Sequence, residues 1–110
     1  MAMTAYTTTL NDLLGRVPRR HSIENVKEIN AILDEYESIL QSIEGTNAWY
    51  EKQTARLFDT ADTIRATIKM SNDNKASKKN KDNFFDEASG LLKDDIQALM
   101  AIYEEGKSLK

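Results

Sequence analysis

The chain contains no cysteine, one proline, one histidine and four glycines among its 110 residues. Without cysteine it has no disulfide framework, no thiolate metal site and no cysteine nucleophile. No apolar run approaches the roughly 20 residues that a membrane-spanning helix needs. The start also lacks a basic segment followed by an apolar one, the pattern of a secretory signal. We therefore expect a soluble protein of the cytoplasm, where disulfides are rare.

Charge is distributed unevenly along a chain whose formal net charge is −3. Acidic residues dominate 21–45 and 84–110, whereas basic residues gather in two short islands. The first island surrounds Pro18 and the second lies in a polar stretch; together they comprise Arg16, Arg19, Arg20, Lys75, Lys78, Lys79 and Lys81. Domains that bind nucleic acid are usually basic overall. The acidic background therefore makes nucleic acid the less favoured partner.

Three stretches carry apolar residues at the three- and four-residue spacings of amphipathic helices. These spacings predict long helices over about 22–44, 46–70 and 82–105. The first seam comprises Val26, Ile29, Leu33, Tyr36, Leu40 and Ile43. The second comprises Tyr50, Thr54, Leu57, Ala61, Ile64 and Ile68, and the third Phe85, Ala88, Leu92, Ile96, Leu99 and Tyr103. No stretch alternates with the two-residue period of a strand over a convincing length.

Capping residues and glycines mark where these helices begin and end. The expected N-caps are Ser22 for the first helix and Thr46 or Asn47 for the second. Gly45 and Gly106 are expected just after helix ends, where glycine adopts the left-handed conformation at little cost. Gly90 lies inside the third helix and suggests a close crossing or a bend, since glycine weakens a helix interior by about 1 kcal/mol.

These elements predict an all-α bundle of three long amphipathic helices, with a short N-terminal helix over about 10–16. Residues 1–20 form an N-terminal segment and residues 21–110 the bundle domain, which includes a polar linker at 71–81. The short turn at Gly45 makes the first two helices antiparallel neighbours. The long linker leaves two arrangements open: the third helix packs in its own chain, or it crosses to another chain in a coiled-coil-like dimer.

Residues that could carry chemistry are few. His21 and Glu24 lie three apart, but no second histidine completes a metal site of the kind that helical bundles build. Asp62 on the second helix is expected to pair with Arg65 rather than to act as a catalytic carboxylate. Glycine-rich phosphate loops and nucleophile motifs are absent. We expect no enzymatic activity, no cofactor and no metal.

Two aromatic side chains do not fit the seams. Trp49 precedes the seam residue Tyr50, and Phe84 precedes Phe85, and neighbouring side chains on a helix point about 100° apart. Aromatic residues are enriched at interface hot spots. The N-terminal segment holds Leu10, Leu13 and Leu14, which either pack on an end of the bundle or reach a neighbouring chain. The candidate partner-binding residues are therefore Leu10, Leu13, Leu14, Trp49 and Phe84.

The sequence thus favours a non-enzymatic protein–protein interaction module: an adaptor, chaperone or accessory protein that acts through helical faces. Its expected partners are a second copy of the chain, as a homodimer or larger assembly, and another protein; no membrane partner is expected. The alternative is a nucleic-acid-binding accessory protein whose two basic islands contact phosphates. Lysines without interleaved aromatic residues cannot stack bases, which disfavours this alternative.

Overall fold

Four α-helices make up the part of the chain that the structure, a computed structural model, describes: the backbone of residues 2–108 and the side chains of residues 6–107. They are α1 (Ala2–Arg16), α2 (Ile23–Glu44), α3 (Ala48–Ser71) and α4 (Lys78–Ser108). They form an elongated bundle of 51 × 23 × 16 Å. Within the described residues there is no strand, so the predicted all-α bundle is confirmed.

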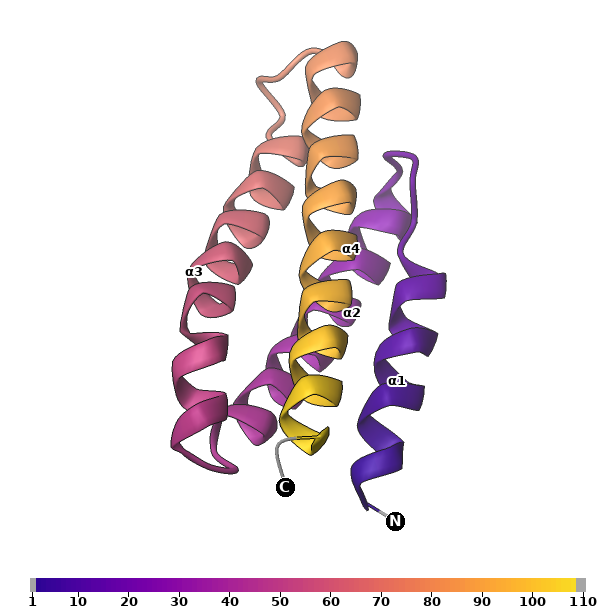
Figure 1. Cartoon of the computed structure of the whole chain (residues 1–110). Helices are drawn as coiled ribbons and strands as arrows, with labels where there is room; N and C mark the ends of the chain where they lie inside the picture. Colours follow the sequence, from indigo (N-terminus) through magenta and orange to yellow (C-terminus); the bar gives the residue numbers. More distant parts are fainter. Residues whose placement is uncertain (1, 109–110) are drawn as a thin grey trace.

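The helices alternate in direction along the bundle (Figure 1). The start of α1, the end of α4 and the α2–α3 turn lie at one end, here named the terminal end. The α1–α2 and α3–α4 connectors lie toward the other, named the connector end. α4 packs against α3 and α1 of its own chain, so the bundle closes without a second copy. α2 crosses behind α4, from the start of α3 toward the end of α1 (Figure 1).

The predicted seams form the core. All eighteen seam residues are buried, and the core also takes in Leu10, Leu13, Val17, Ile32 and Ile102. A residue every three or four positions returns to the same side of a helix, so each seam faces its neighbours along the whole contact. Burial of these side chains from water is the main term that stabilises the bundle.

The predicted N-caps of α2 and α3 are confirmed. The Ser22 hydroxyl accepts a hydrogen bond from the Asn25 N–H at 3.0 Å, and the Asn47 side chain accepts one from the Tyr50 N–H at 3.0 Å. Gly45 ends α2 as predicted but with φ −75° and ψ −2°, which is right-handed, so the left-handed prediction for this residue was wrong. Its N–H instead bonds to the carbonyls of the last α2 turn.

Two helices are longer than the seams predicted. α1 includes residues 2–9, because Tyr6 packs edge-on against Tyr103 at 5.4 Å between ring centroids and the Thr7 hydroxyl donates to Glu104 at 2.5 Å. α4 begins at Lys78, where the Ser77 hydroxyl accepts a bond from the Asn80 N–H at 3.2 Å. The polar linker therefore shortens to residues 72–77.

The predictions for the glycines of α4 also need correction. α4 runs through Gly106, which lies against the Tyr50 ring so closely that a Cβ would overlap that ring. The close approach suggested for Gly90 is absent, since a Cβ there would meet nothing within 4 Å. The tight contact along α4 thus occurs at the terminal end rather than in the middle of the helix.

Candidate functional site

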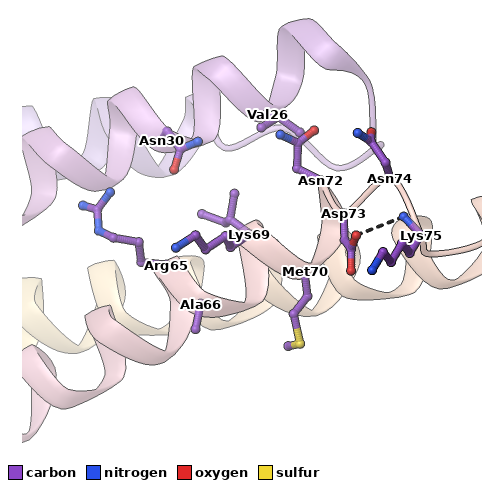
Figure 2. Close-up of a pocket in the computed structure, with 11 residues that line it drawn as sticks. Val26, Asn30, Arg65, Ala66, Lys69, Met70, Asn72, Asp73, Asn74 and Lys75 are labelled. Atoms are coloured by element: carbon purple, nitrogen blue, oxygen red, sulfur yellow. Dashed lines mark hydrogen bonds between the residues drawn. The ribbon is translucent and has the colours of Figure 1, made fainter.

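A groove lies between the first half of α2 and the second half of α3, and the α3–α4 connector closes one end of it (Figure 2). It has a volume of about 950 Å³. We call it the α2–α3 groove; its lining residues are Val26, Asn30, Arg65, Ala66, Ile68, Lys69, Met70, Asn72, Asp73, Asn74 and Lys75. Ligand pockets typically occupy about 300–1,000 Å³, so the groove is large enough for a ligand or a short peptide segment.

Apolar side chains bound this groove on both helices. Val26 of α2 and Ile68 of α3 are buried at its base. Met70 is 45% exposed and leaves α3 on the side away from α2 (Figure 2), so it forms the outer edge. Ile23, one helical turn before Val26, is 74% exposed. Among the side chains of residues 6–107, Ile23 and Met70 are the large apolar ones that are exposed.

Arg65 joins the two helices at the inner end of the groove. Its guanidinium donates to the Asp34 carboxylate at 2.8 Å and to the Glu37 carboxylate, both on α2. The bond to Glu37 and the two negative charges raise the pKa of Arg65 above its ordinary value. The predicted pairing of Arg65 with Asp62 is therefore wrong, because the two carboxylates of α2 take its place. This cross-helix contact holds α2 to α3 where the groove begins.

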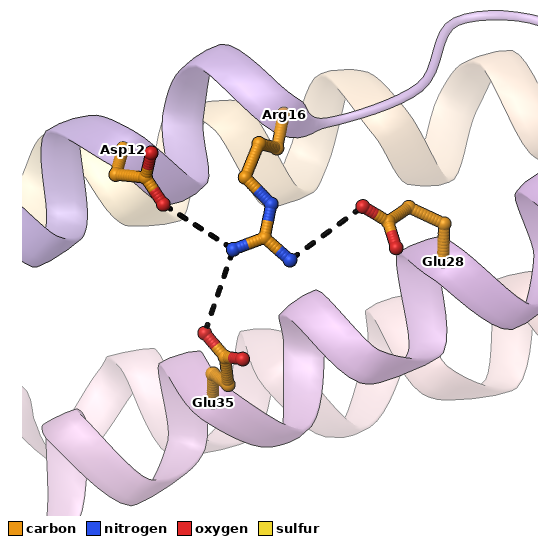
Figure 3. A network of polar contacts seen from close by, with 4 residues as sticks. All are labelled: Asp12, Arg16, Glu28 and Glu35. Atoms are coloured by element: carbon orange, nitrogen blue, oxygen red, sulfur yellow. Dashed lines mark hydrogen bonds and ion pairs between the residues drawn. The ribbon is translucent and has the colours of Figure 1, made fainter.

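The Arg16 guanidinium forms the corresponding contact between α1 and α2 (Figure 3). It pairs with Asp12 at 3.2 Å, Glu28 at 3.5 Å and Glu35 at 3.9 Å. The hydrogen bond to Asp12, together with the other carboxylates, raises the pKa of Arg16. Three carboxylates around one guanidinium leave it little capacity for a phosphate, so Arg16 is engaged within the fold.

The candidate partner-binding residues occupy different positions in the fold. Leu10 and Leu13 are fully buried in the core, so a partner meets them only if α1 leaves the bundle. Leu14 and Trp49 are half-buried against the core, and Trp49 contacts Tyr50 edge-on at 5.2 Å. Phe84 is half-buried on α4, toward the connector end. The structure therefore does not bring these five residues into one surface.

Apart from Arg16, the residues of the two basic islands lie toward the connector end. Arg19 and Arg20 lie in the α1–α2 connector, and the lysines lie in the α3–α4 connector or the first turn of α4 (Figure 1). Arg19, Arg20, Lys75, Lys78 and Lys79 are exposed, whereas Lys81 is half-buried. The fold thus places both basic islands, apart from Arg16, toward the same end of the bundle.

A buried carboxylate lies in the middle of the bundle. Asp95 of α4 is 5% exposed, and the Tyr36 hydroxyl of α2 donates to its carboxylate at 3.2 Å and to its backbone carbonyl at 3.3 Å. Burial raises the pKa of Asp95 to about 6, against the opposing effects of the Tyr36 hydrogen bond and of Arg56. Burial and the Asp95 charge also raise the pKa of Tyr36. The pair is buried in the bundle and does not line the α2–α3 groove, so we interpret it as a structural contact.

His21, the single histidine, packs edge-on against Phe85 with ring centroids 5.8 Å apart. Its Nε2 atom is buried without a hydrogen-bond partner. Among the described residues, no three acidic, histidine or cysteine side chains gather in a way that could hold a metal ion. His21 thus anchors the α1–α2 connector on α4, next to the bond that the Ser89 hydroxyl donates to the Pro18 carbonyl at 2.6 Å.

Comparisons of the chain with protein-family models, curated protein sequences and solved structures find no match. Across residues 2–108, none of the helices combines the length and the apolar character that crossing a bilayer requires. The sequence did not predict the α2–α3 groove, because the apolar seams indicate which residues pack between helices and not where two helices separate. The available signal was Ile23, Met70 and Lys69, which the seam of neither helix accommodates.

Proposed function

We propose that the protein is a non-enzymatic interaction module, an adaptor of the cytoplasm, which binds another protein through the α2–α3 groove. The observation that carries this proposal is the position of Ile23 and Met70. They are the exposed large apolar side chains of the described part; Met70 lines the groove, and Ile23 stands one helical turn before the lining residue Val26. Apolar side chains that border a groove are typical of interaction sites.

A coiled-coil-like homodimer, the other expectation from the sequence, has less support. Its seams are occupied within one chain, since every seam residue of α2, α3 and α4 is buried there. Self-association would therefore use the groove or another surface. Light scattering distinguishes a second copy from another protein as the partner, because a single chain has a mass of 12.5 kDa and self-association raises the mass of the purified protein above that value.

The test compares the wild-type protein with the double variant Ile23→Ser, Met70→Ser. The matched control is Ala55→Ser, Ala101→Ser, at two exposed positions that do not line the groove. We expect one protein to co-purify in a fixed ratio with the wild type and with the control. The amount of this protein recovered with the groove variant should be at least about fivefold lower, which corresponds to a loss of about 1 kcal/mol of binding free energy. The proposal is wrong if the protein is a monomer of 12.5 kDa and the wild type, the groove variant and the control all recover the same proteins in equal amounts.

A nucleic-acid-binding accessory protein is the second candidate, favoured by one observation: both basic islands, apart from Arg16, lie toward the connector end (Figure 1). It predicts that a 20-nucleotide single-stranded DNA binds and that this binding falls steeply between 50 and 200 mM salt, because phosphate contacts release counterions. Lys78→Glu, Lys79→Glu should abolish it. Fluorescence anisotropy that shows no binding at 50 mM salt removes this candidate.

A further inference from the structure

The groove borders the most basic stretch of the chain. Residues 65–81 hold six lysines and arginines and one acid, a net charge of +5. Because the whole chain has a formal charge of −3, the other residues together carry −8. The basic stretch runs from the second half of α3 through the α3–α4 connector into the first turn of α4, so its positive charge borders the groove within an otherwise acidic chain. A segregation of this kind steers ligands of opposite charge to that end.

Two cations of the groove have no partner of their own within the described part of the chain. Arg65 is paired with Asp34 and Glu37, but Lys69 and Lys75 are exposed and form none of the ion pairs among residues 6–107. In Figure 2, the Lys69 side chain extends along the space between α2 and α3. The one acid of the lining, Asp73, is held in the connector by the Lys75 N–H, which donates to its carboxylate at 2.9 Å. Lys69 and Lys75 are thus available to a carboxylate from outside.

Amides and apolar surface complete the lining. The side chains of Asn30, Asn72 and Asn74 offer donors and acceptors, and Val26 and Ile68 lie beneath them. Most of the lining from Lys69 to Lys75 is exposed, so the groove is open and suits a chain segment better than an enclosed small molecule. Its walls combine positive charge with an apolar base and the exposed edge of Met70.

We propose that the α2–α3 groove binds a short acidic segment of a partner protein, in which carboxylates that pair with Lys69 and Lys75 flank a large apolar side chain seated beside Met70. The inference rests on the proposed function and names the chemistry of its partner. A nucleic-acid strand matches the groove less well, since no aromatic ring lines the groove for a base to stack on. A second copy also matches less well, because four carboxylates of its α2 are already paired with Arg16 or Arg65.

The test is a selection of random 12-residue peptides, displayed on phage, against the folded wild-type protein. We expect the selected peptides to be enriched in Asp and Glu together with Leu, Ile, Phe or Met. The best one is then synthesised with a fluorescent label, and its affinity is measured by anisotropy at 150 mM salt. A matched peptide with Asn and Gln in place of Asp and Glu should bind at least about tenfold more weakly.

Two charge-reversal variants locate the peptide. Lys69→Glu, Lys75→Glu changes the lining, whereas Lys78→Glu, Lys79→Glu makes the same change of charge in the same stretch but outside the lining. We expect the first to weaken the labelled peptide at least about tenfold and the second less than about threefold, since charges beyond roughly 8 Å are screened at this salt. Circular dichroism shows whether each variant keeps its helices, and only variants that keep them are compared.

Three outcomes overturn the inference, and they separate it from the proposed function. In the first, the selected peptides contain no carboxylates, and the Ile23→Ser, Met70→Ser variant no longer binds them. This result refutes the acidic partner but leaves the groove as an interaction site. Equal loss with both lysine variants, or displacement of the peptide by a 20-nucleotide DNA, shows a general anion surface instead. Failure of the wild-type protein to select any peptide above an unrelated helical protein overturns the inference and counts against the groove itself.

Discussion

The two ends of the bundle are built differently. At the terminal end, Tyr6, Tyr50 and Tyr103 pack ring against ring, the Tyr50 hydroxyl donates to the Tyr103 carbonyl at 2.9 Å, and Gly106 lies directly against Tyr50. At the connector end, α2 and α3 part around the groove, and amides and lysines line the space. Tyrosine packing thus closes the terminal end, whereas the α2–α3 groove leaves the connector end more open. A rigid scaffold that ends in a more open surface is the usual arrangement of a binding site.

The largest expected effect concerns the Asp95–Tyr36 contact, which lies between the two ends. Burial raises the pKa of Asp95 from 3.8 to about 6, a difference of about 3 kcal/mol between its charged and neutral forms. The folded state therefore binds this proton more tightly than the unfolded state. The contribution of Asp95 to the free energy of unfolding is most favourable below about pH 4, falls as the pH rises to about 6, and stays low above it.

Asp95→Asn removes this charge and keeps an acceptor for the Tyr36 hydroxyl. At pH 8 we expect the variant to be more stable than wild type by up to about 3 kcal/mol, and the difference to vanish near pH 4. Urea unfolding followed by circular dichroism at pH 4, 6 and 8 measures it. Asp94→Asn, at an exposed neighbour with the same change of charge, is the matched control. A constant difference at all three pH values would contradict the buried-charge explanation.

The second prediction breaks the closed end. Gly106→Ala places a methyl group where the Tyr50 ring lies, and that ring is buried and held by its bond to Tyr103. We expect a loss of about 2 kcal/mol, typical of overpacking, or on the order of 10 °C in melting temperature for a domain of this size. Tyr50→Leu in the same chain should relieve the overlap, so the two substitutions together should cost less than the sum of their separate effects. Additive losses would show that the contact is not the cause.

Gly90→Ala is the matched substitution away from that contact. Gly90 lies in the same helix, is exposed, and has open space where a Cβ would stand. Alanine should therefore stabilise α4 by about 1 kcal/mol, because it removes the conformational freedom of glycine in the unfolded chain without a clash. Thermal unfolding should show a lower melting temperature for Gly106→Ala and a higher one for Gly90→Ala, if packing differs between these two positions of α4. A loss of stability with Gly90→Ala would mean that a contact or bend requires the glycine there.

The difference between the ends also explains what the sequence could predict. Every residue of the seams predicted for α2, α3 and α4 is buried, since burial at three- and four-residue spacing depends on the helix period. The start of α1 was missed because its threonine-rich residues have weak helix propensity, and contacts of Tyr6 and Thr7 with the end of α4 stabilise it. The start of α4 was missed because the Ser77 cap precedes polar residues rather than a seam.

The groove could not be predicted from the same pattern. It depends on the angle at which α2 leaves α3, and helices with similar seams pack at several angles. Arg65 shows the problem at one residue: its sequence neighbour Asp62 suggested a pair within α3, whereas the fold places Asp34 and Glu37 within reach. The lysines that border the groove were visible, but their position beside an apolar base follows only from the fold.

The smallest expected effects come from the two N-caps, one near each end. Asn47→Ala removes the acceptor of the Tyr50 N–H, next to the aromatic cluster, and Ser22→Ala removes the acceptor of the Asn25 N–H, next to the groove. Each loss is about 1 kcal/mol or less. Because Tyr50 is part of the closed packing, Asn47→Ala should lower the global free energy of unfolding by most of that amount.

Ser22→Ala should act locally instead, since its backbone carbonyl still accepts the Val26 N–H at 2.9 Å and the first turn of α2 can open without disturbing the core. Native-state hydrogen exchange measures the difference. We expect faster exchange for the first turns of α2 alone with Ser22→Ala, and faster exchange throughout the bundle with Asn47→Ala. If both variants accelerate the whole bundle equally, the connector end is as tightly coupled to the core as the terminal end. The groove would then be a rigid feature, and a bound segment would have to fit it without rearrangement of α2.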